Sequence, residues 1–328
     1  MGGCDFFTKK MILLTHIGEL PSYLYIFLKQ IRLFNPNVPI YFIGDKKNIN
    51  LFDEFNIKFI FKDINKNSLY QNLLKLDKER NIFNTPKNFW IYTYARFYLL
   101  NEVVTENNFT DVFYFENDIM IYGNVNELLN TLNKDIYFTI GDHIRATTGF
   151  SFFRNHKILN RLVEDMDSIL NNKIEIKDIR KNYSRCCPSE MIILRKIKYK
   201  YNYINEFPLL PYTTTQETLK EMTSSGGSLS PYTLKYYDNF INLNKYIFDP
   251  ATYGQYLGGN NNNKKFKDFG IYEKNTYIGK EILKNKIKVL WERDEDNLNR
   301  PYCLYEKEKY KIFNLHIHSK NLKQFESL

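Results

Sequence analysis

The sequence predicts an α/β fold in which helices cover a parallel β-sheet. Three short apolar runs favour strands at residues 11–15, 39–45 and 57–61, and a helical pattern fills residues 21–34 between the first two. A strand, a helix and a strand in close succession are typical of parallel sheets. Ligands of such sheets bind beyond the carboxyl ends of the strands.

Polar residues stand at these strand ends. Thr15 and His16 close the first run, and Asp45 closes the second. We therefore expect Thr15, His16 and Asp45 to lie beside a bound ligand. No G-x-G-x-x-G motif follows the first strand, which disfavours both a dinucleotide site and a P-loop.

The alternation of predicted strands and helices continues along the chain. Apolar and aromatic residues three and four positions apart predict a buried helix at 89–100 that carries Arg96. A further helix begins near Ser189, its expected cap. The other expected elements are strands at 111–115, 136–140, 149–154 and 312–318, and helices at 157–170 and 251–257.

Composition limits the class of protein. The 328 residues, 43% hydrophobic and 16% aromatic, suffice for one large α/β domain or two small ones. The formal charge of +9 is scattered along the chain, which favours solvated faces and anionic small substrates over a nucleic-acid groove.

The four cysteines form no C-x-x-C motif, so we expect neither a zinc cluster nor a disulfide framework. This suits a reducing compartment such as the cytoplasm. The N-terminal residues do not resemble a signal peptide, and no run of eighteen apolar residues predicts a transmembrane helix.

Two carboxylates, Glu116 and Asp118, stand two residues apart at the end of the strand expected at 111–115. In a strand, residues two apart point to the same side, so both carboxylates can face one divalent cation. A pair of solvated acids at a strand end is the simpler alternative.

His316 and His318 repeat this spacing near the end of the chain, and Lys320 follows them. Imidazole and carboxylate together suit Mn²⁺ better than Ca²⁺, and a lysine beside them can neutralise phosphate. We therefore expect a site in which Asp118, Glu116, His316 and His318 hold Mn²⁺ or Mg²⁺. Two exposed histidines on an edge strand are the alternative.

The order of these motifs resembles the nucleotide-sugar glycosyltransferases of the GT-A fold. In those enzymes a D-x-D motif follows a helix that bears an arginine, as Glu116 and Asp118 here follow Arg96. Blocks 249–259 and 315–322 resemble paired C-terminal blocks in glycosyltransferases of bacteria and large DNA viruses. Glycogenin-like and galactosyltransferase-like relatives likewise end with a metal-binding histidine and a phosphate-binding lysine. Glu116 departs from the family, where Asp is usual, so Asp118 is the safer ligand.

The resemblance implies a single GT-A domain over residues 1–328, with a Rossmann-like, mixed and mainly parallel sheet flanked by helices. Residues 10–155 would bind the nucleotide sugar, and residues 156–328 would bind the acceptor and complete the metal site. The implied reaction moves a sugar from a UDP- or GDP-sugar to a glycan or protein-linked acceptor. Thr15, His16 and Asp45 would hold base and ribose, and Arg96 and Lys320 would face the diphosphate.

An inverting enzyme needs a base that deprotonates the acceptor, and two residues are candidates for it. A retaining enzyme would need no such base in the usual place, and the sequence leaves both stereochemical outcomes open. Asp249 precedes the helix at 251–257 and is either that base or a plain helix cap. Glu190 stands where many of these enzymes carry an acidic residue facing the sugar, and is either the base or a partner of sugar hydroxyls. Segment 212–246, rich in Tyr, Thr and Ser, either binds the acceptor or is a surface excursion.

Two other functions stay open at this point. A sugar nucleotidyltransferase also needs paired carboxylates and a cation, although it would normally show a glycine-rich loop after the first strand. A non-catalytic carbohydrate-binding relative would bind sugar without metal or nucleotide.

Overall fold

The computed structural model describes residues 10–83, 89–142, 144–182, 187–211, 243, 246–258, 274 and 276–328. Its centre is a seven-stranded sheet with β7 antiparallel to both of its neighbours and every other pairing parallel. This confirms the predicted mixed, mainly parallel sheet. From one edge to the other the strands are β3 (Ile57–Phe61), β2 (Ile40–Gly44), β1 (Met11–His16), β4 (Thr110–Phe115), β7 (Ala146–Asn155), β6 (Ile136–Ile140) and β8 (Ile204–Glu206).

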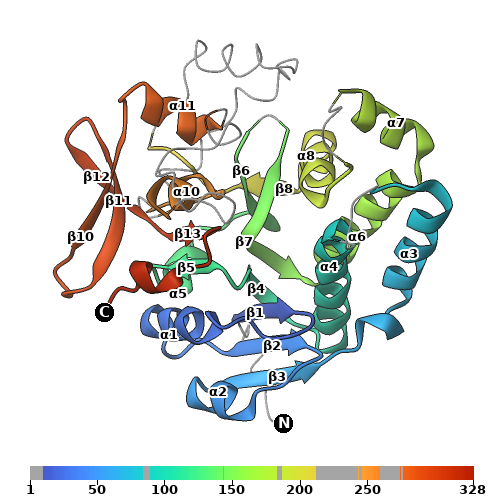
Figure 1. The fold of residues 1–328 in the computed structure, drawn as a ribbon, viewed down its shortest axis with the longest axis horizontal. Helices are drawn as coiled ribbons and strands as arrows, with labels where there is room; N and C mark the ends of the chain where they lie inside the picture. Colours follow the sequence, from blue (N-terminus) through green and yellow to red (C-terminus); the bar gives the residue numbers. More distant parts are fainter. Residues whose placement is uncertain are drawn as a thin grey trace, which may run out of the picture.

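Helices lie on both sides of the sheet, as predicted. In Figure 1, α3, α4, α6, α7 and α8 lie to the right of the sheet, and α1, α5 and α10 lie to its left. The helices are α1 (Leu24–Phe34), α2 (Ile49–Glu54), α3 (Ser68–Arg80), α4 (Phe89–Glu106), α5 (Val125–Leu129), α6 (His156–Asn171), α7 (Lys173–Asn182), α8 (Glu190–Lys200), α10 (Thr252–Gly258) and α11 (Tyr277–Leu283), with short 3₁₀ turns η1 (Ile64–Lys66) and η6 (Leu322–Phe325).

The chain reverses its direction of travel across the sheet at β1. From β1 the chain moves outward to β2 and β3, and it then returns to place β4 on the other side of β1. Such a switch point opens a crevice where ligands of α/β sheets bind.

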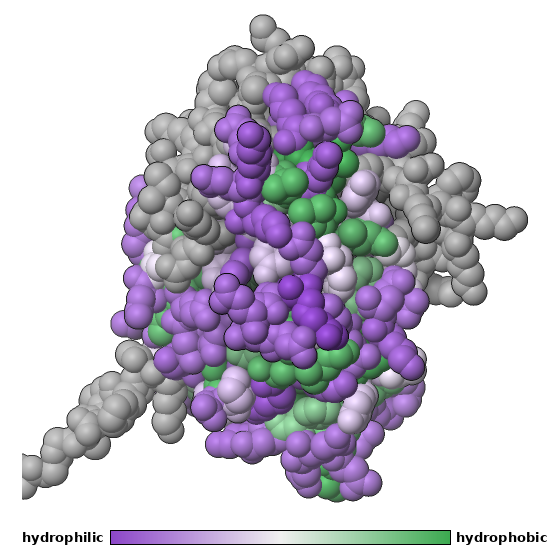
Figure 2. All heavy atoms as spheres, turned by 90° about the vertical axis from the view of Figure 1, so that its left-hand side faces the viewer, coloured by the Kyte–Doolittle hydropathy of each residue, from purple (hydrophilic) through white to green (hydrophobic). Residues whose placement is uncertain are grey.

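Two smaller sheets complete the fold. An antiparallel ribbon joins β5 (Ile119–Ile121) to β13 (Asn314–His316), almost 200 residues later in the chain. The other sheet has the order β10 (Lys288–Arg293), β11 (Asn299–Tyr305), β12 (Glu308–Ile312) and β9 (Tyr246–Ile247). Figure 2 shows the face that lies on the left-hand side of Figure 1. The described surface there is mostly hydrophilic, with apolar patches between the hydrophilic areas.

Three predicted elements differ from the structure. The strand expected at 312–318 is divided, because the Phe313 N–H donates to the Ile247 carbonyl and the chain passes from β12 to β13. The helix expected at 21–34 begins only at Leu24. Ser189 occupies the cap position of α8, but its side chain makes no capping hydrogen bond. Within the proposed acceptor segment, residues 212–242 lie outside the described part of the chain.

In the described part of the chain, no helix combines the length and apolarity that crossing a membrane requires.

Gly254 of α10 lies against the strand that carries His316. A Cβ at Gly254 would stand 2.1 Å from the His316 carbonyl oxygen, and neither backbone can yield easily. We expect Gly254→Ala to lower the free energy of unfolding by about 3 kcal/mol, the upper end for overpacking.

Gly141→Ala is the matched control for this variant. A Cβ at Gly141 would meet the Pro250 Cβ at 3.3 Å, which a small shift relieves. We expect a loss of less than about 1 kcal/mol. Urea denaturation measures both variants, and equal losses would contradict the close-packed contact at Gly254.

Candidate active site

A cavity of about 1030 Å³ opens at the carboxyl ends of β1, β2 and β4. Its walls come from segments that are far apart in the sequence. Of the eleven residues predicted to form the site, ten line this cavity: Thr15, His16, Asp45, Arg96, Glu116, Asp118, Glu190, His316, His318 and Lys320. Asp249 does not line it.

Asn117 ties the ends of β1 and β4 together. Its Nδ2 donates to the Thr15 carbonyl at 3.2 Å and lies 3.1 Å from His16 Nδ1. The loop after β1 is also fixed to β2, because Gly18 N–H donates to Asp45 Oδ1 at 2.8 Å. Gly18 has a φ of +91°, a conformation that favours glycine. The polar groups predicted at the strand ends therefore form one connected edge.

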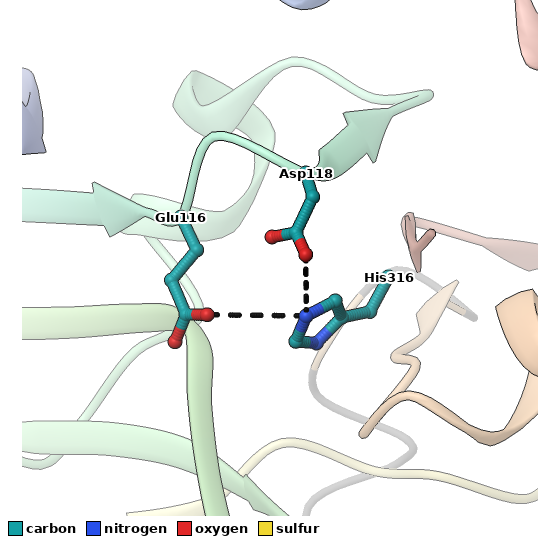
Figure 3. Close-up of side chains that lie close together, drawn as sticks. All are labelled: Glu116, Asp118 and His316. Atoms are coloured by element: carbon teal, nitrogen blue, oxygen red, sulfur yellow. Dashed lines mark hydrogen bonds and ion pairs between the residues drawn. The ribbon is translucent and has the colours of Figure 1, made fainter. Parts of the chain in front are cut away.

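Glu116, Asp118 and His316 come together at the middle of the cavity. Their ligand atoms all lie within 4.8 Å of one another. His316 Nε2 is 3.2 Å from Asp118 Oδ2 and 3.8 Å from Glu116 Oε2, and Figure 3 shows both carboxylates directed at this nitrogen. Glu116 and Asp118 lie in the turn between β4 and β5, whereas a strand was predicted. The turn, not strand alternation, brings the two carboxylates to one side.

The donor set fits a divalent cation. Two ligands at about 2.1 Å on neighbouring corners of an octahedron lie about 3 Å apart, which is close to the His316–Asp118 separation. Two carboxylates with one imidazole suit Mn²⁺ among the common divalent ions. His316 Nδ1 is buried without a hydrogen-bond partner, and a Cβ at Gly149 would stand 3.0 Å from it. Glycine at position 149 therefore leaves room for the ring.

Lys320 places a positive charge on this group, because its ammonium pairs with Asp118. Burial would raise the pKa of Asp118, but the His316 imidazole and the Lys320 ammonium hold it well below its usual range. Burial lowers and Asp118 raises the pKa of His316, and the net effect is a raised pKa. Both shifts favour the charged forms of the pair.

His318 stands apart from the group of possible ligands. Its Nδ1 lies 2.6 Å from Gln255 Nε2, which donates to it. Its ring meets the His316 ring edge to face, with 4.5 Å between the centroids. Burial, and then the neighbouring His316, lower the pKa of His318 to about 3, so its ring is neutral. The prediction that His318 shares the metal is not supported by this geometry.

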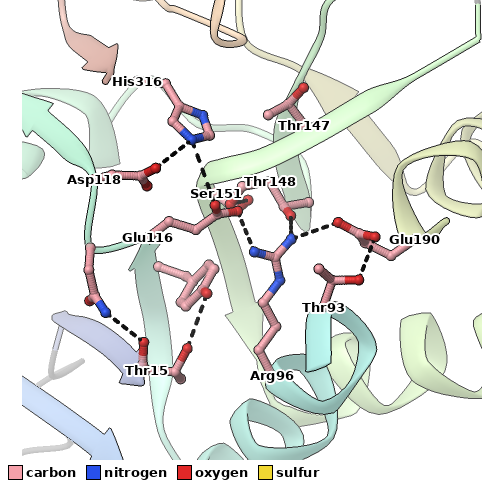
Figure 4. Close-up of polar contacts among 12 residues, drawn as sticks. Thr15, Thr93, Arg96, Glu116, Asp118, Thr147, Thr148, Ser151, Glu190 and His316 are labelled. Carbon is pink, nitrogen blue, oxygen red and sulfur yellow. Dashed lines mark hydrogen bonds and ion pairs between the residues drawn. The ribbon is translucent and has the colours of Figure 1, made fainter. Parts of the chain in front are cut away.

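Arg96 connects the ligand group to the far wall of the cavity. Its guanidinium donates to Glu116 at 2.5 Å and to Thr148 and Glu190 at 3.1 Å each (Figure 4). The second oxygen of Glu190 accepts a hydrogen bond from Thr93 at 2.7 Å. Burial is the main reason that the pKa of Glu190 is raised. The helix predicted to carry Arg96 thus places it between two carboxylates.

Asp249 is a helix cap. It is only 2% exposed, and its oxygens accept hydrogen bonds from the backbone of Thr252, Tyr253, Gly254 and His316 at 2.6–2.9 Å. Both oxygens are occupied, and the side chain does not reach the cavity. Of the two roles predicted for Asp249, capping is the one that the structure shows. The role as a base stays a prediction that these contacts disfavour.

Sequence reasoning missed Tyr23 and Gln255, which both line the cavity. Burial raises the pKa of Tyr23, and the charges of Asp118 and Glu116 raise it further, which places Tyr23 beside the ligand group. Gln255 follows Thr252 by three residues on α10. That spacing puts both on one helix face, a signal that was present in the sequence.

No protein-family model matches the chain, and no curated protein does either. Among solved structures the chain is similar to mouse xyloside xylosyltransferase 1, with 11% identity, 61% of this chain and 85% of that chain covered, and a TM-score of 0.44. It is also similar to the galactosyltransferase LgtC in complex with donor and acceptor sugar analogs. That match has 13% identity, covers 69% of this chain and 82% of that chain, and has a TM-score of 0.41.

A cytidylyltransferase from Leptospira borgpetersenii is similar as well, with 14% identity, 68% of this chain and 89% of that chain covered, and a TM-score of 0.34. Two of these three structures are glycosyltransferases, the family that the motifs of the chain resemble.

Substitutions of the two histidines separate their roles. We expect His316→Ala and Asp118→Asn to weaken Mn²⁺ binding by at least about a hundredfold, since the first removes a ligand atom and the second removes the negative charge of a ligand. His318→Ala is the matched control, and we expect it to change the Mn²⁺ affinity less than about threefold, since its Nδ1 faces Gln255. Isothermal titration with Mn²⁺ measures all three. Equal losses for the two histidine variants would show that both are ligands.

The capping role of Asp249 predicts a loss of stability. An amide at this position turns an N–H₂ group toward backbone N–H donors and leaves them unsatisfied. We expect Asp249→Asn to cost about 2–3 kcal/mol. Asp63→Asn, at the exposed cap of η1, should cost less than about 0.5 kcal/mol. Thermal unfolding measures both, and an unchanged midpoint for Asp249→Asn would contradict the capping role.

Proposed function

We propose that the protein is a metal-dependent glycosyltransferase that moves a sugar from a nucleoside-diphosphate sugar to a glycan or protein-linked acceptor. One observation carries this proposal: Glu116, Asp118 and His316 meet in a large cavity, with Lys320 beside them. A cation site at the switch point of an α/β sheet suits a diphosphate.

The two ends of the cavity suit the two ends of such a donor. Thr15, His16 and Asp45 present hydroxyl, imidazole and carboxylate groups at the ends of β1 and β2, where a base and ribose would bind. Arg96, Thr93 and Glu190 present a polar cluster on the other side of the ligand group, where the transferred sugar would lie.

Charge development on the leaving group sets the chemical requirement. As the bond from the anomeric carbon to the diphosphate oxygen breaks, its electron pair leaves with the diphosphate. A bound Mn²⁺ or Mg²⁺ would stabilise that negative charge. Lys320 adds a positive charge at the same place, and it can turn from Asp118 to the phosphate.

Glu190 is the proposed acceptor of the remaining proton. The acceptor hydroxyl oxygen bonds to the anomeric carbon, and its hydrogen must go to a base. Among the described residues, the carboxyls that line the cavity outside the ligand group are Asp45, Asp142 and Glu190. Asp45 lies at the nucleoside end. Asp142 is fixed by backbone N–H groups of its own loop and by Arg145, whereas Glu190 accepts from the side chains of Arg96 and Thr93. The raised pKa of Glu190 suits a base that takes up a proton.

Turnover of a panel of UDP- and GDP-sugars with Mn²⁺ tests the proposal. We expect Glu190→Gln to lower transfer by about 10²–10⁴-fold, while nucleotide with Mn²⁺ still raises its melting temperature. Glu79→Gln, an exposed position on α3, is the control and should keep full turnover. If Asp118→Ala keeps metal-dependent turnover, the assignment as a glycosyltransferase is wrong. If only Glu190→Gln keeps it, another group takes the proton.

A further inference from the structure

The cavity has a second polar wall, opposite the ends of β1 and β2. It is formed by the hairpin between β6 and β7, by α10, and by the residues after β13. From β1 to β6 the sheet crosses three strand spacings, about 14 Å at about 4.8 Å each. A nucleoside held at the ends of β1 and β2 therefore leaves this wall free for a second substrate.

Side-chain hydroxyls dominate this wall. Thr147, Thr252 and Thr276 all line it. The Thr252 hydroxyl donates to that of Thr276 at 3.2 Å, and the Thr147 hydroxyl lies 3.4 Å from the Pro250 carbonyl. A hydroxyl offers one hydrogen and two lone pairs, so Thr147 and Thr252, which each donate one hydrogen bond, keep lone pairs for a ligand. Thr276 already accepts from Thr252 and from the Gly279 N–H.

The two charges on the β6–β7 hairpin neutralise each other. Asp142 Oδ2 accepts from Arg145 Nε at 2.7 Å and pairs with a second guanidinium nitrogen at 2.5 Å. Asp142 Oδ1 accepts from the backbone N–H groups of Ile144 and Arg145. The pair presents a fixed array of polar atoms with no net charge, which does not select an anionic or a cationic ligand.

Gln255 fixes the orientation of His318 in the same wall. Because Gln255 Nε2 donates to His318 Nδ1 at 2.6 Å, Nδ1 carries no hydrogen and the ring hydrogen lies on Nε2. His318 lines the cavity, so its Nε2–H is a hydrogen-bond donor for a ligand oxygen. The wall thus offers both donors and acceptors to a neutral ligand rich in hydroxyls.

We propose that this wall is the acceptor subsite and that it binds the sugar ring of a neutral saccharide, with Gln255 positioning His318 as a donor to that ring. The proposal rests on the proposed function, because it needs a donor sugar in the cavity. A neutral saccharide is chemically complementary to the wall, because its hydroxyls both donate and accept hydrogen bonds and it carries no charge.

Kinetics with chosen acceptors test the subsite. The probes are methyl glycosides of glucose, galactose, mannose, xylose and N-acetylglucosamine, with a peptide containing Ser and Thr as the competing acceptor. We expect a glycoside, and not the peptide, to accelerate consumption of the donor. Gln255→Met should raise the KM for that glycoside about tenfold, the loss expected for one hydrogen bond, with a smaller change in kcat. Gln324→Met, an exposed glutamine in η6, should leave both constants unchanged.

A spectroscopic measurement tests the positioning without any substrate. In the wild type, nitrogen-15 spectra should show the His318 hydrogen on Nε2. In Gln255→Glu the carboxylate attracts that hydrogen to Nδ1, and the glycoside KM should rise as in Gln255→Met, although the ring stays in place.

Several results would overturn the subsite. They are acceleration by the peptide alone, acceleration by no glycoside while the donor is hydrolysed, an unchanged KM in Gln255→Met, and a wild-type hydrogen on Nδ1. Failure of the proposed function is distinct, because it would appear as absent metal-dependent donor hydrolysis in the wild type.

Discussion

The candidate site depends on the pairing of β5 with β13. This ribbon is three residues long on each side, yet it brings Asp118 and His316 together from positions 198 residues apart. The Ile317 N–H donates to the Asp118 carbonyl and extends the ribbon past the two side chains. Asp249 holds the other side of β13 through the His316 N–H. A buried carboxylate that accepts four backbone hydrogen bonds is costly to lose, so it fixes the strand where the ligand group needs it.

Charge balance explains why so many acids can lie together under this ribbon. Glu116, Asp118 and Glu190 are carboxyl groups in or beside one cavity, and Arg96 and Lys320 pair with them. The charged form of His316 balances the third acid, but a bound metal would need the neutral imidazole. Without the His316 proton, the acids exceed the cations by one. A divalent ion would turn this excess into a net positive charge, which is what a diphosphate requires. Arg96 also prevents Glu116 and Glu190 from repelling each other, so the two acids keep fixed positions.

Local sequence patterns predicted the parts of this site that depend on local structure. Strand ends placed Thr15, His16 and Asp45, and helical spacing placed Arg96 on a buried helix. The same patterns could not separate the two roles of Asp249, because an aspartate before a helix looks the same in the sequence whether it is a cap or a base. The hydrogen bonds of its carboxylate to the backbone distinguish the two roles. His316 and His318 are equivalent by spacing, and only the contact of His318 with Gln255 distinguishes them. The turn at Glu116–Asp118 was mistaken for a strand because a β-prone run leads into it.

The reversed strand β7 gives this sheet two substrate walls. In an all-parallel sheet, each strand delivers only its carboxyl end to the ligand edge. Here β6 arrives at that edge and β7 leaves from it, so their hairpin stands directly over the crevice. It contributes Asp142 and Arg145 to the second wall, and Thr148 and Gly149 to the surroundings of Arg96 and His316. Position 149 requires a small residue because the His316 ring lies against the start of β7. One antiparallel strand thus joins the ligand group to the second wall, and a substitution in the hairpin acts on both.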